Sequence, residues 1–308
     1  MRKKRIVFMI ALSLIATTLS AQVHAISSPR FARPLVEKWI EEYAKVEPDV
    51  HFKLLNGCGC TKESELYILP YSKEATEADN TNDNVIYFAA YAILPFTAAD
   101  SEAAQILGGR KLNNKRLRNI FFEHEYFTSD EELTKQEKRE KRLVVYSANN
   151  GASTTDPFSA FFQESTGSLR GKRIAGDDAF LTAAVKKDPL GVSFNALSNL
   201  YDLDSRKLKE GLSILQLATK KELEESLINT TTLDTLVELL EKYSADEVPT
   251  GKLGLAYKGD NKEVQRFLAW VLTAGRQLNH HYGLLQIDEQ LAQQQIEAIN
   301  TGLTAQNR

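Results

Sequence analysis

Hydrophobic and polar positions along the chain follow two different periods. Between residues 34 and 48, apolar side chains recur every three to four positions and a proline stands at each end, which predicts an amphipathic helix. The next stretch, DVHFKLLNG, alternates and closes on turn residues, so it predicts a strand that runs into a loop. SELYILPY and NVIYFAAYAILPF predict further strands, and the second is apolar enough to be buried on both faces.

The alternation of strands and helices continues through the rest of the chain. Two helices, TAADSEAAQILGG and NNKRLRNIFFE, precede a charged stretch at residues 123–142 that is typical of a solvated helical excursion. The middle third then predicts a strand, two helices and a strand, at LVVYSA, DPFSAFFQES, GDDAFLTAAVKKDP and LGVSFNAL. The last third predicts a helix, a strand and a long helix, at TLDTLVELLEKYS, GKLGLAYKG and NKEVQRFLAWVLTAGRQLNHHYG. This order indicates the α/β class, with mixed, mostly parallel sheets and crossover helices.

Residues 1–25 have the three parts of a secretory signal peptide. They open on the basic MRKKR, continue with the apolar IVFMIALSLIA and end on the small residues of AQVHA. The apolar run is shorter than the roughly 20 residues that a membrane span needs, and no later stretch approaches that length. We therefore expect export of the mature protein to the periplasm or the medium.

The charge of the remaining chain limits its partners. The whole sequence has 38 Lys and Arg residues against 41 Asp and Glu residues. Four of the basic residues lie in the leader, so the remainder carries a net charge of −7 with histidine neutral. This balance argues against a nucleic-acid partner.

The length of the mature chain predicts two domains of roughly 100 to 150 residues each. No linker separates them, so we expect two lobes joined by two crossing strands, with a ligand cleft between the lobes. Residues 26–95 and 250–308 are assigned to the first lobe, and residues 96–249 to the second. The crossings are expected near residues 93–96 and 253–257.

A candidate anion site lies in SANNGASTTDPF, between a predicted strand and the start of a helix. Backbone N–H groups at a helix start are unpaired and carry partial positive charge, and hydroxyl groups add neutral donors. Ser153, Thr154 and Thr155 either contact a ligand here or only cap the helix that begins near Asp156.

A second candidate loop follows the predicted strand DVHFKLLNG. Asn56, Gly57 and Cys58 form either a ligand loop or an ordinary turn. Cys58 and Cys60 are separated by one residue, and they are either bridged after export or free.

The sequence resembles the phosphate-type substrate-binding proteins of ABC transporters over nearly the whole mature chain. The resemblance implies two α/β lobes that close on an oxyanion and present it to a membrane transporter or another envelope protein. It rests on five segments in the family's order, namely FARPLVEKWIEEYAKVEPDV, the Gly-rich loop, VVYSANNGASTTDPF, FLTAAVKKDPLGVSFNALSNL and VQRFLAWVLTAGRQL.

The family's site residues fall only partly on matching positions. Gly151 to Thr154 occupy the family's Gly-Ser-Gly-Thr stretch, with Ala152 at the serine and Ala148 at the preceding arginine. Arg30 and Phe31 occupy a family threonine and phenylalanine, so Arg30 either returns a positive charge to the site or lies on the surface. The family aspartate that accepts the proton of phosphate belongs near ILPYS, which holds no carboxylate.

Three classes of function remain open on these residues. The first is an exported solute-binding protein for phosphate or a related oxyanion, and the second is an interaction or sensor protein that kept the fold and lost or altered its ligand. The third and weakest is a hydrolase built on Ser153, which lacks the strand-Gly-x-Ser-x-Gly-helix context. We expect no enzyme and no cofactor.

Two further polar pairs are assigned no ligand. His280 and His281 are adjacent on a predicted helix and so point to different faces, which argues against a metal site. Asp177 and Asp178 are interpreted as residues that cap the start of a helix.

Overall fold

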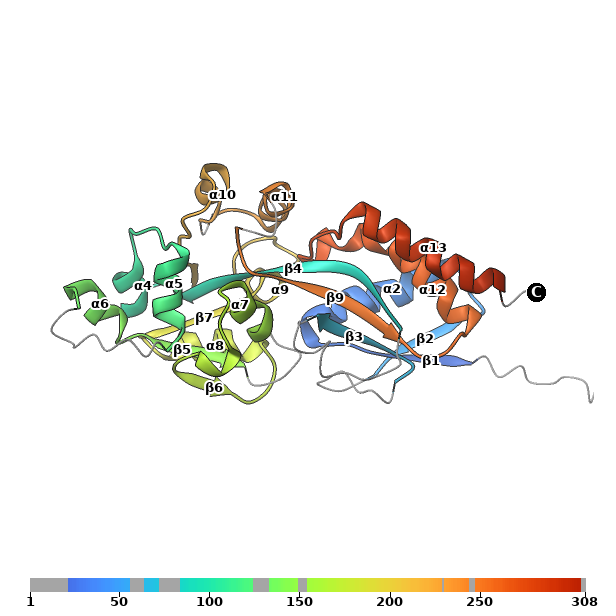
Figure 1. Ribbon diagram of the computed structural model, residues 1–308, viewed down its shortest axis with the longest axis horizontal. Helices are drawn as coiled ribbons and strands as arrows, with labels where there is room; N and C mark the ends of the chain where they lie inside the picture. The colour runs from blue at the N-terminus through green and yellow to red at the C-terminus, as the bar shows by residue number, and fades with distance from the viewer. Residues whose placement is uncertain are drawn as a thin grey trace, which may run out of the picture.

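The computed structural model describes residues 22–55, 64–71, 84–123, 133–148, 154–228, 230–243 and 247–305. Helices pack on a curled mixed sheet that extends through both halves of an elongated molecule (Figure 1). Within these ranges no helix has both the length and the apolar character to cross a bilayer.

The sheet is parallel toward its two ends and antiparallel in its centre. The strands are β1 (Val23–Ser27), β2 (His51–Leu54), β3 (Leu66–Tyr71), β4 (Asn84–Ala98), β5 (Val144–Ala148), β6 (Lys172–Ile174), β7 (Gly191–Ala196), β8 (Leu212–Ile214) and β9 (Thr250–Tyr257). Their order is β2-β1-β3-β9-β4-β7-β5-β6, and β8 pairs with β4 off this path. The pairs of β1 with β2 and β3, and of β5 with β6 and β7, are parallel, whereas β4 and β9 pair antiparallel to their neighbours.

Strands β4 and β9 run side by side between the two lobes (Figure 1). Residues 84–92 of β4 pair with β9, and residues 93–97 pair with β7 of the second lobe. The α/β class with two lobes and crossing strands is thus confirmed. The residue boundaries of the lobes stay a prediction.

Helices cover the sheet in both lobes. In the first lobe these are η1 (Arg30–Ala32), α2 (Arg33–Val46), α12 (Lys262–Leu272), η3 (Gly275–Leu278), η4 (His280–Tyr282) and α13 (Glu289–Ala305). The rest are α4 (Glu102–Leu107), α5 (Asn114–Phe121), α6 (Lys135–Glu140), α7 (Thr155–Phe161), η2 (Thr166–Ser168), α8 (Ala179–Lys187), α9 (Leu197–Leu200), α10 (Lys221–Ser226) and α11 (Leu233–Tyr243). The predicted first helix is confirmed, because α2 has a proline in its first turn and buries Leu35, Trp39 and Tyr43.

Aromatic side chains form a packed group in each lobe. In the first, the rings of Phe52 and Phe267 stack at 4.2 Å between centroids, and Tyr43 meets both edge-on. In the second, the rings of Phe158 and Phe194 stack at 3.8 Å. Aromatic pairs of this kind stabilise a core beyond their buried area. Each lobe therefore has its own aromatic centre, and apolar residues of β4 connect the two.

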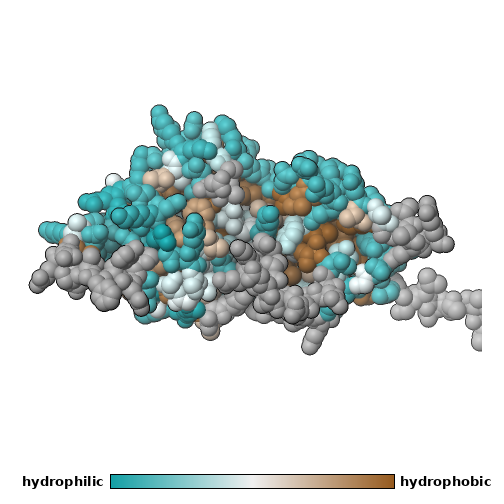
Figure 2. Space-filling model, viewed as in Figure 1, coloured by the Kyte–Doolittle hydropathy of each residue, from teal (hydrophilic) through white to brown (hydrophobic). Residues whose placement is uncertain are grey.

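Most of the surface seen in Figure 2 is hydrophilic, whereas hydrophobic residues reach it mainly in the middle of the view, over β4 and β9. Val85 of β4 is exposed and belongs to this apolar surface.

The register of β4 shifts between Tyr87 and Ala89. There the Tyr87 N–H donates to Gln295 Oε1 at 2.6 Å, and Gln295 Nε2 donates to the Tyr87 carbonyl at 2.8 Å. The Gln295 side-chain amide of α13 thus supplies hydrogen-bond partners for the backbone of Tyr87 where the register shifts.

The lobes also contact each other through α11. Glu241 Oε1 lies 2.8 Å from His280 Nε2 and accepts the Gln286 N–H. Arg206 donates to the His280 carbonyl at 3.0 Å. Helix α11, which the sequence assigns to the second lobe, is therefore hydrogen-bonded to the last part of the first.

The charged stretch at residues 123–142 is only partly solvated. Within it, α6 begins with a capping box in which Thr134 and Glu137 bond each other's backbone N–H groups. Glu140 at its end is buried and accepts a hydrogen bond from Arg116 Nε at 2.9 Å. The interpretation of a solvated excursion is therefore wrong for Glu140, whereas residues 124–132 lie outside the described ranges.

The first strand overlaps the last three residues of the predicted leader. Val23, His24 and Ala25 belong to β1, which pairs with both β2 and β3. A cut after Ala25 would remove these three residues from the sheet. The leader over residues 1–25 and its boundary stay a prediction. Residues 1–21 lie outside the described part of the chain.

His24 fixes β1 to its surroundings through two carboxylates. Its side chain is fully buried, with Nδ1 2.8 Å from Glu65 Oε2 and Nε2 2.8 Å from Glu263 Oε2. Both ring nitrogens can donate to carboxylates only if the imidazole is protonated. Burial lowers the pKa of His24, but the hydrogen bonds to Glu263 and Glu65 outweigh burial and raise this pKa above its ordinary value.

We expect the stabilisation from His24 to be lost at alkaline pH. A folded-state pKa above the unfolded value means that the contribution is complete below about pH 6.5 and disappears as pH rises through the folded pKa. The Glu263 side chain is 40% exposed, so solvent limits the effect to about 2 kcal/mol.

The measurement is denaturant unfolding of the protein and of His24→Gln at about pH 6 and about pH 9. The variant should be less stable by about 2 kcal/mol at the lower pH, with a much smaller difference at the higher pH. An equal difference at both values would show that His24 is neutral in the folded protein.

Candidate functional site

The start of α7 is the described part of the predicted anion loop. Thr154 is fully buried, and no side-chain hydrogen bond from it caps the helix. The Thr155 hydroxyl donates to the carbonyl of Ala148 at 3.2 Å and so ties the helix start to the end of β5. Gly151 and Ser153 lie outside the described residues, as do Asn56, Gly57, Cys58 and Cys60.

A carboxylate of the protein itself reaches the start of α7. The backbone N–H of Thr154 donates to Asp178 Oδ2 at 2.7 Å, and Asp178 is 2% exposed. Asp178 stands at the N-cap position of α8, as the sequence predicts, but its side chain makes no capping hydrogen bond to that helix. Asp177 takes that role and accepts the Ala179 N–H at 2.9 Å. Asn195 Nδ2 donates to the Asp178 carbonyl at 2.8 Å and holds this turn in place.

Burial changes the acidity of Asp178. It raises the pKa of the carboxyl to about 7, against the opposing effect of the hydrogen bond from the Thr154 backbone. The charge of Asp177 raises this pKa further, the neighbouring Thr154 side chain lowers it, and the charge of Asp156 raises it by the smallest amount. Near neutral pH the carboxyl therefore exists in both forms, and the protonated form can donate a hydrogen bond.

Tyr91 brings a third buried polar group to the same place from β4. It pairs with Gly251 of β9, and its ring lies over that glycine, where an added Cβ would stand 2.3 Å from the ring. Burial raises the pKa of Tyr91, and the charges of Asp178 and Asp156 raise it further. The hydroxyl is therefore neutral and lies within the field of Asp178.

Three polar atoms at this place have no hydrogen-bond partner among the described residues. They are Tyr91 Oη, Thr154 Oγ1 and Asp178 Oδ1, and all three are buried. An unpaired buried polar atom costs about 1–3 kcal/mol, so native structures contain few of them. The described residues hold eleven such atoms, and these three stand out because Thr154 is hydrogen-bonded to Asp178 and the charge of Asp178 acts on Tyr91. We call this group the β4–α7–α8 cluster and take it as the candidate ligand site.

Residues of η1 approach the cluster from the first lobe. Phe31 is buried, and its ring centroid lies 5.2 Å from that of Tyr91. Arg30 is exposed, and its guanidinium lies 5.4 Å from the ring centroid of Phe180, in the first turn of α8. The structure thus brings Arg30, Phe31 and Thr154 to one region.

Sequence reasoning missed Tyr91 and Asp178. A tyrosine in a strand that is buried on both faces needs a hydrogen-bond partner for its hydroxyl. This need could have identified Tyr91 from the sequence. The sequence does not indicate where the Asp178 carboxyl points, because its partner Thr154 lies 24 residues earlier.

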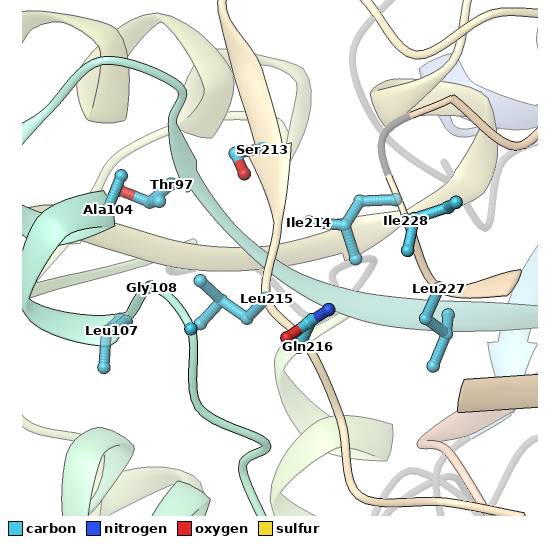
Figure 3. A pocket seen from close by; sticks show the side chains of 11 residues that line it. Thr97, Ala104, Leu107, Gly108, Ser213, Ile214, Leu215, Gln216, Leu227 and Ile228 are labelled. Atoms are coloured by element: carbon cyan, nitrogen blue, oxygen red, sulfur yellow. The ribbon is translucent and has the colours of Figure 1, made fainter. Parts of the chain in front are cut away.

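A separate hollow of about 320 Å³ lies in the second lobe (Figure 3). Residues from the end of β4, α4, β8 and the segment after α10 line it: Thr97, Ala104, Leu107, Gly108, Gly109, Ser213, Ile214, Leu215, Gln216, Leu227 and Ile228. This lining contains no charged side chain and no residue of the β4–α7–α8 cluster. It offers no counter-charge to an anion.

A metal centre is not apparent in the described ranges, where no three His, Cys, Asp or Glu side chains are placed to hold one ion. The two adjacent histidines lie in the 3₁₀ helix η4 rather than in a continuous α-helix.

Comparisons with known proteins identify the fold. No protein-family model matches the sequence, and no curated protein matches it. A candidate phosphate ABC transporter substrate-binding protein from Clostridium perfringens, solved with bound phosphate, has a TM-score of 0.59 at 14% identity, over 87% of this chain and 100% of that chain. An ABC-type phosphate transport receptor from Vibrio cholerae has a TM-score of 0.55 at 12% identity, over 86% and 100%.

A regulatory domain shares the same fold. It is that of Synechocystis PCC6803 CcmR in complex with 2-PG, with a TM-score of 0.50 at 14% identity, over 82% of this chain and 97% of that chain. At sequence identities this low, the similarity shows a shared fold and nothing more specific. The chain has the two-lobe fold of phosphate-type binding proteins, a fold that regulatory domains also use.

Proposed function

We propose that the protein is an exported solute-binding protein that captures a small oxyanion, phosphate or a relative of it, for an ABC transporter. The observation that carries the proposal is the β4–α7–α8 cluster, whose three buried polar atoms have no hydrogen-bond partner within the described ranges and whose Tyr91 ring contacts Phe31 of η1. The fold of the solved phosphate-binding structures supports it. We propose no catalysis at this site.

An oxyanion suits the chemistry of the cluster. The hydroxyls of Tyr91 and Thr154 are donors, and the carboxyl of Asp178 becomes a donor when protonated. A compact ion with several acceptor oxygens can accept all three hydrogen bonds. Ala148 stands at the family's arginine position and is buried, so a positive charge would have to come from elsewhere. Arg30 is our candidate for this charge.

The remaining predicted ligand residues stay part of the proposal. Gly151 and Ser153 precede Thr154 directly, and Asn56, Gly57 and Cys58 follow β2 of the first lobe. Closure of the lobes would bring the two loops onto one ligand and present a closed surface to the transporter or another envelope protein.

One observation favours the alternative, an interaction or sensor protein with a lost or altered ligand. The carboxylate of Asp178 already accepts the Thr154 N–H, and an anion at the start of α7 would use this donor. A fixed internal anion can replace a bound one. Binding measurements decide between the two functions.

We expect weak binding of phosphate with little preference over sulfate. Loss of the family arginine removes charge-assisted hydrogen bonds worth roughly 1.5 to 3 kcal/mol each, or about one to two orders of magnitude in affinity. Arg30→Ala should weaken binding by about a further tenfold, and calorimetric titration with both anions measures these affinities.

The matched control is Arg266→Ala, another exposed arginine of the first lobe, which lies near Glu47 and away from η1. It should bind as the unaltered protein does. Tight, phosphate-selective binding that survives Arg30→Ala would show that Arg30 has no compensating role. Absence of binding of either anion would favour the interaction or sensor function.

A further inference from the structure

We infer that capture of an anion by the β4–α7–α8 cluster takes up one proton, which the Asp178 carboxyl carries rather than the ligand. This inference rests on the proposed function. It concerns the protonation of the protein, so it applies equally to an anion that has no proton of its own.

The position of the carboxyl is fixed. Oδ2 accepts the Thr154 N–H at 2.7 Å, and Asn195 bonds the main-chain carbonyl of Asp178 at 2.8 Å. The group therefore stays in place unless the backbone changes. An anion that pairs with Thr154 Oγ1 and Tyr91 Oη must come close to Asp178 Oδ1, the third unpartnered atom of the cluster.

Among the described residues around Asp178, Arg30 is the one cation, and it can offset the charge of the anion or of the carboxylate but not both. Three groups act on the Asp178 carboxyl besides Thr154: Asp177 in the same turn, Asp156 in α7 and the neutral hydroxyl of Tyr91 in β4. From η1 comes Arg30, which is exposed and lies over the ring of Phe180. Two of these groups are anionic, and a buried site has a low dielectric constant, so a carboxylate and a bound anion repel strongly.

A proton removes this repulsion and adds a donor. A hydronium ion or a buffer acid in the solvent gives up the proton as its own bond to it breaks. An O–H bond forms on Asp178, and this O–H then donates to the anion. The raised pKa of Asp178, about 7, means that the proton is available near neutral pH. Sulfate is the suitable probe because it carries no proton near neutral pH.

The experiment is titration of the protein with sulfate by calorimetry between about pH 6 and about pH 9. Above the pKa of Asp178, affinity should fall about tenfold for each pH unit. At pH values near 7, the heat of binding should vary between buffers of different ionisation enthalpy as expected for net proton uptake. This second measurement uses only the unaltered protein.

Two variants make the assignment specific. Asp178→Asn should bind sulfate with no pH dependence, and at about pH 9 it should bind at least about tenfold more tightly than the unaltered protein. Asp177→Asn is the matched control, because it removes a carboxylate from the same turn. It should keep the slope of affinity against pH.

The outcomes separate the inference from the function. Sulfate binding that does not change with pH would overturn the inference and leave the proposed function intact. Binding of phosphate without any binding of sulfate would show that the ligand brings the proton, and it would also overturn the inference alone. If neither anion binds to the protein or to Asp178→Asn, the proposed function is wrong and the inference falls with it.

Discussion

Replacing Asp178 with asparagine should stabilise the protein by about 3 kcal/mol at pH values above neutrality, although the change is made at a buried residue. The folded-state pKa of this carboxyl is about 7, against 3.8 for an exposed aspartate. Because each unit corresponds to about 1.4 kcal/mol, the ionised group destabilises the folded state by up to about 4 kcal/mol. Asparagine keeps an acceptor for the Thr154 N–H and carries no charge.

The sign of the effect follows from the raised pKa. The folded protein favours the protonated carboxyl, so the contribution of Asp178 is most favourable below about pH 4 and is lost as pH rises to about 7. The advantage of the variant should therefore be small at acidic pH, grow across this interval and stay constant above it. A residue that reduces stability at working pH is expected at a functional site.

Denaturant unfolding at about pH 4.5, 6 and 8.5 measures the effect. Asp177→Asn serves as the control, because Asp177 caps α8 in the same turn and is less buried. A variant at Asp178 that is destabilised by the same amount at every pH would show that the carboxyl is not strained in the folded protein.

Gly251→Ala should destabilise the protein by about 3 kcal/mol and also weaken anion binding. Tyr91 and Gly251 are directly opposite in the β4–β9 ladder, and an added methyl group would lie 2.3 Å from the Tyr91 ring carbon and 2.4 Å from its hydroxyl oxygen. The ring is fully buried and close-packed, so relief of this overlap requires the ring or the backbone to shift. Displacement of the ring would remove its hydroxyl from the cluster.

Gly254→Ala is the matched control in the same strand. Its added methyl group would meet mainly Val85, whose side chain is exposed and can move. Its effect on stability should be smaller, and anion affinity should not change. A double variant, Gly251→Ala with Tyr91→Ala, should lose less stability than the sum of the single changes. Additive losses would show that the ring and the glycine do not interact.

Residue patterns alone predicted the two-lobe fold and the first helix correctly. Apolar periodicity identified α2, β4, β7 and β9, because these elements bury one or both faces. The predicted long helix after residue 260 was wrong at its end, since α12 stops at Leu272. The chain continues in the 3₁₀ helix η3, which begins at Gly275. Gly275 packs against Trp39 and Trp270, where an added Cβ would lie 3.0 to 3.2 Å from their ring atoms.

The candidate site was predictable only where the sequence places residues next to each other. Thr154 and Thr155 stand between a strand and a helix, and Phe31 precedes the first helix, so their neighbourhood could be inferred. Tyr91 and Asp178 meet Thr154 only through the pairing of β4 with β7 and the turn before α8. Such contacts between distant segments depend on tertiary packing, which periodicity does not report.

Anomalous diffraction from crystals of the protein soaked in selenate at about pH 6 tests the central claim most directly. Selenate has the shape and charge of sulfate, and its selenium can be located without assumptions about the ligand. We predict one anomalous peak within hydrogen-bonding reach of Thr154 Oγ1, Tyr91 Oη and Asp178 Oδ1. A saturating soak that leaves this place empty, or that fills only a site elsewhere on the protein, would contradict an oxyanion site at the β4–α7–α8 cluster.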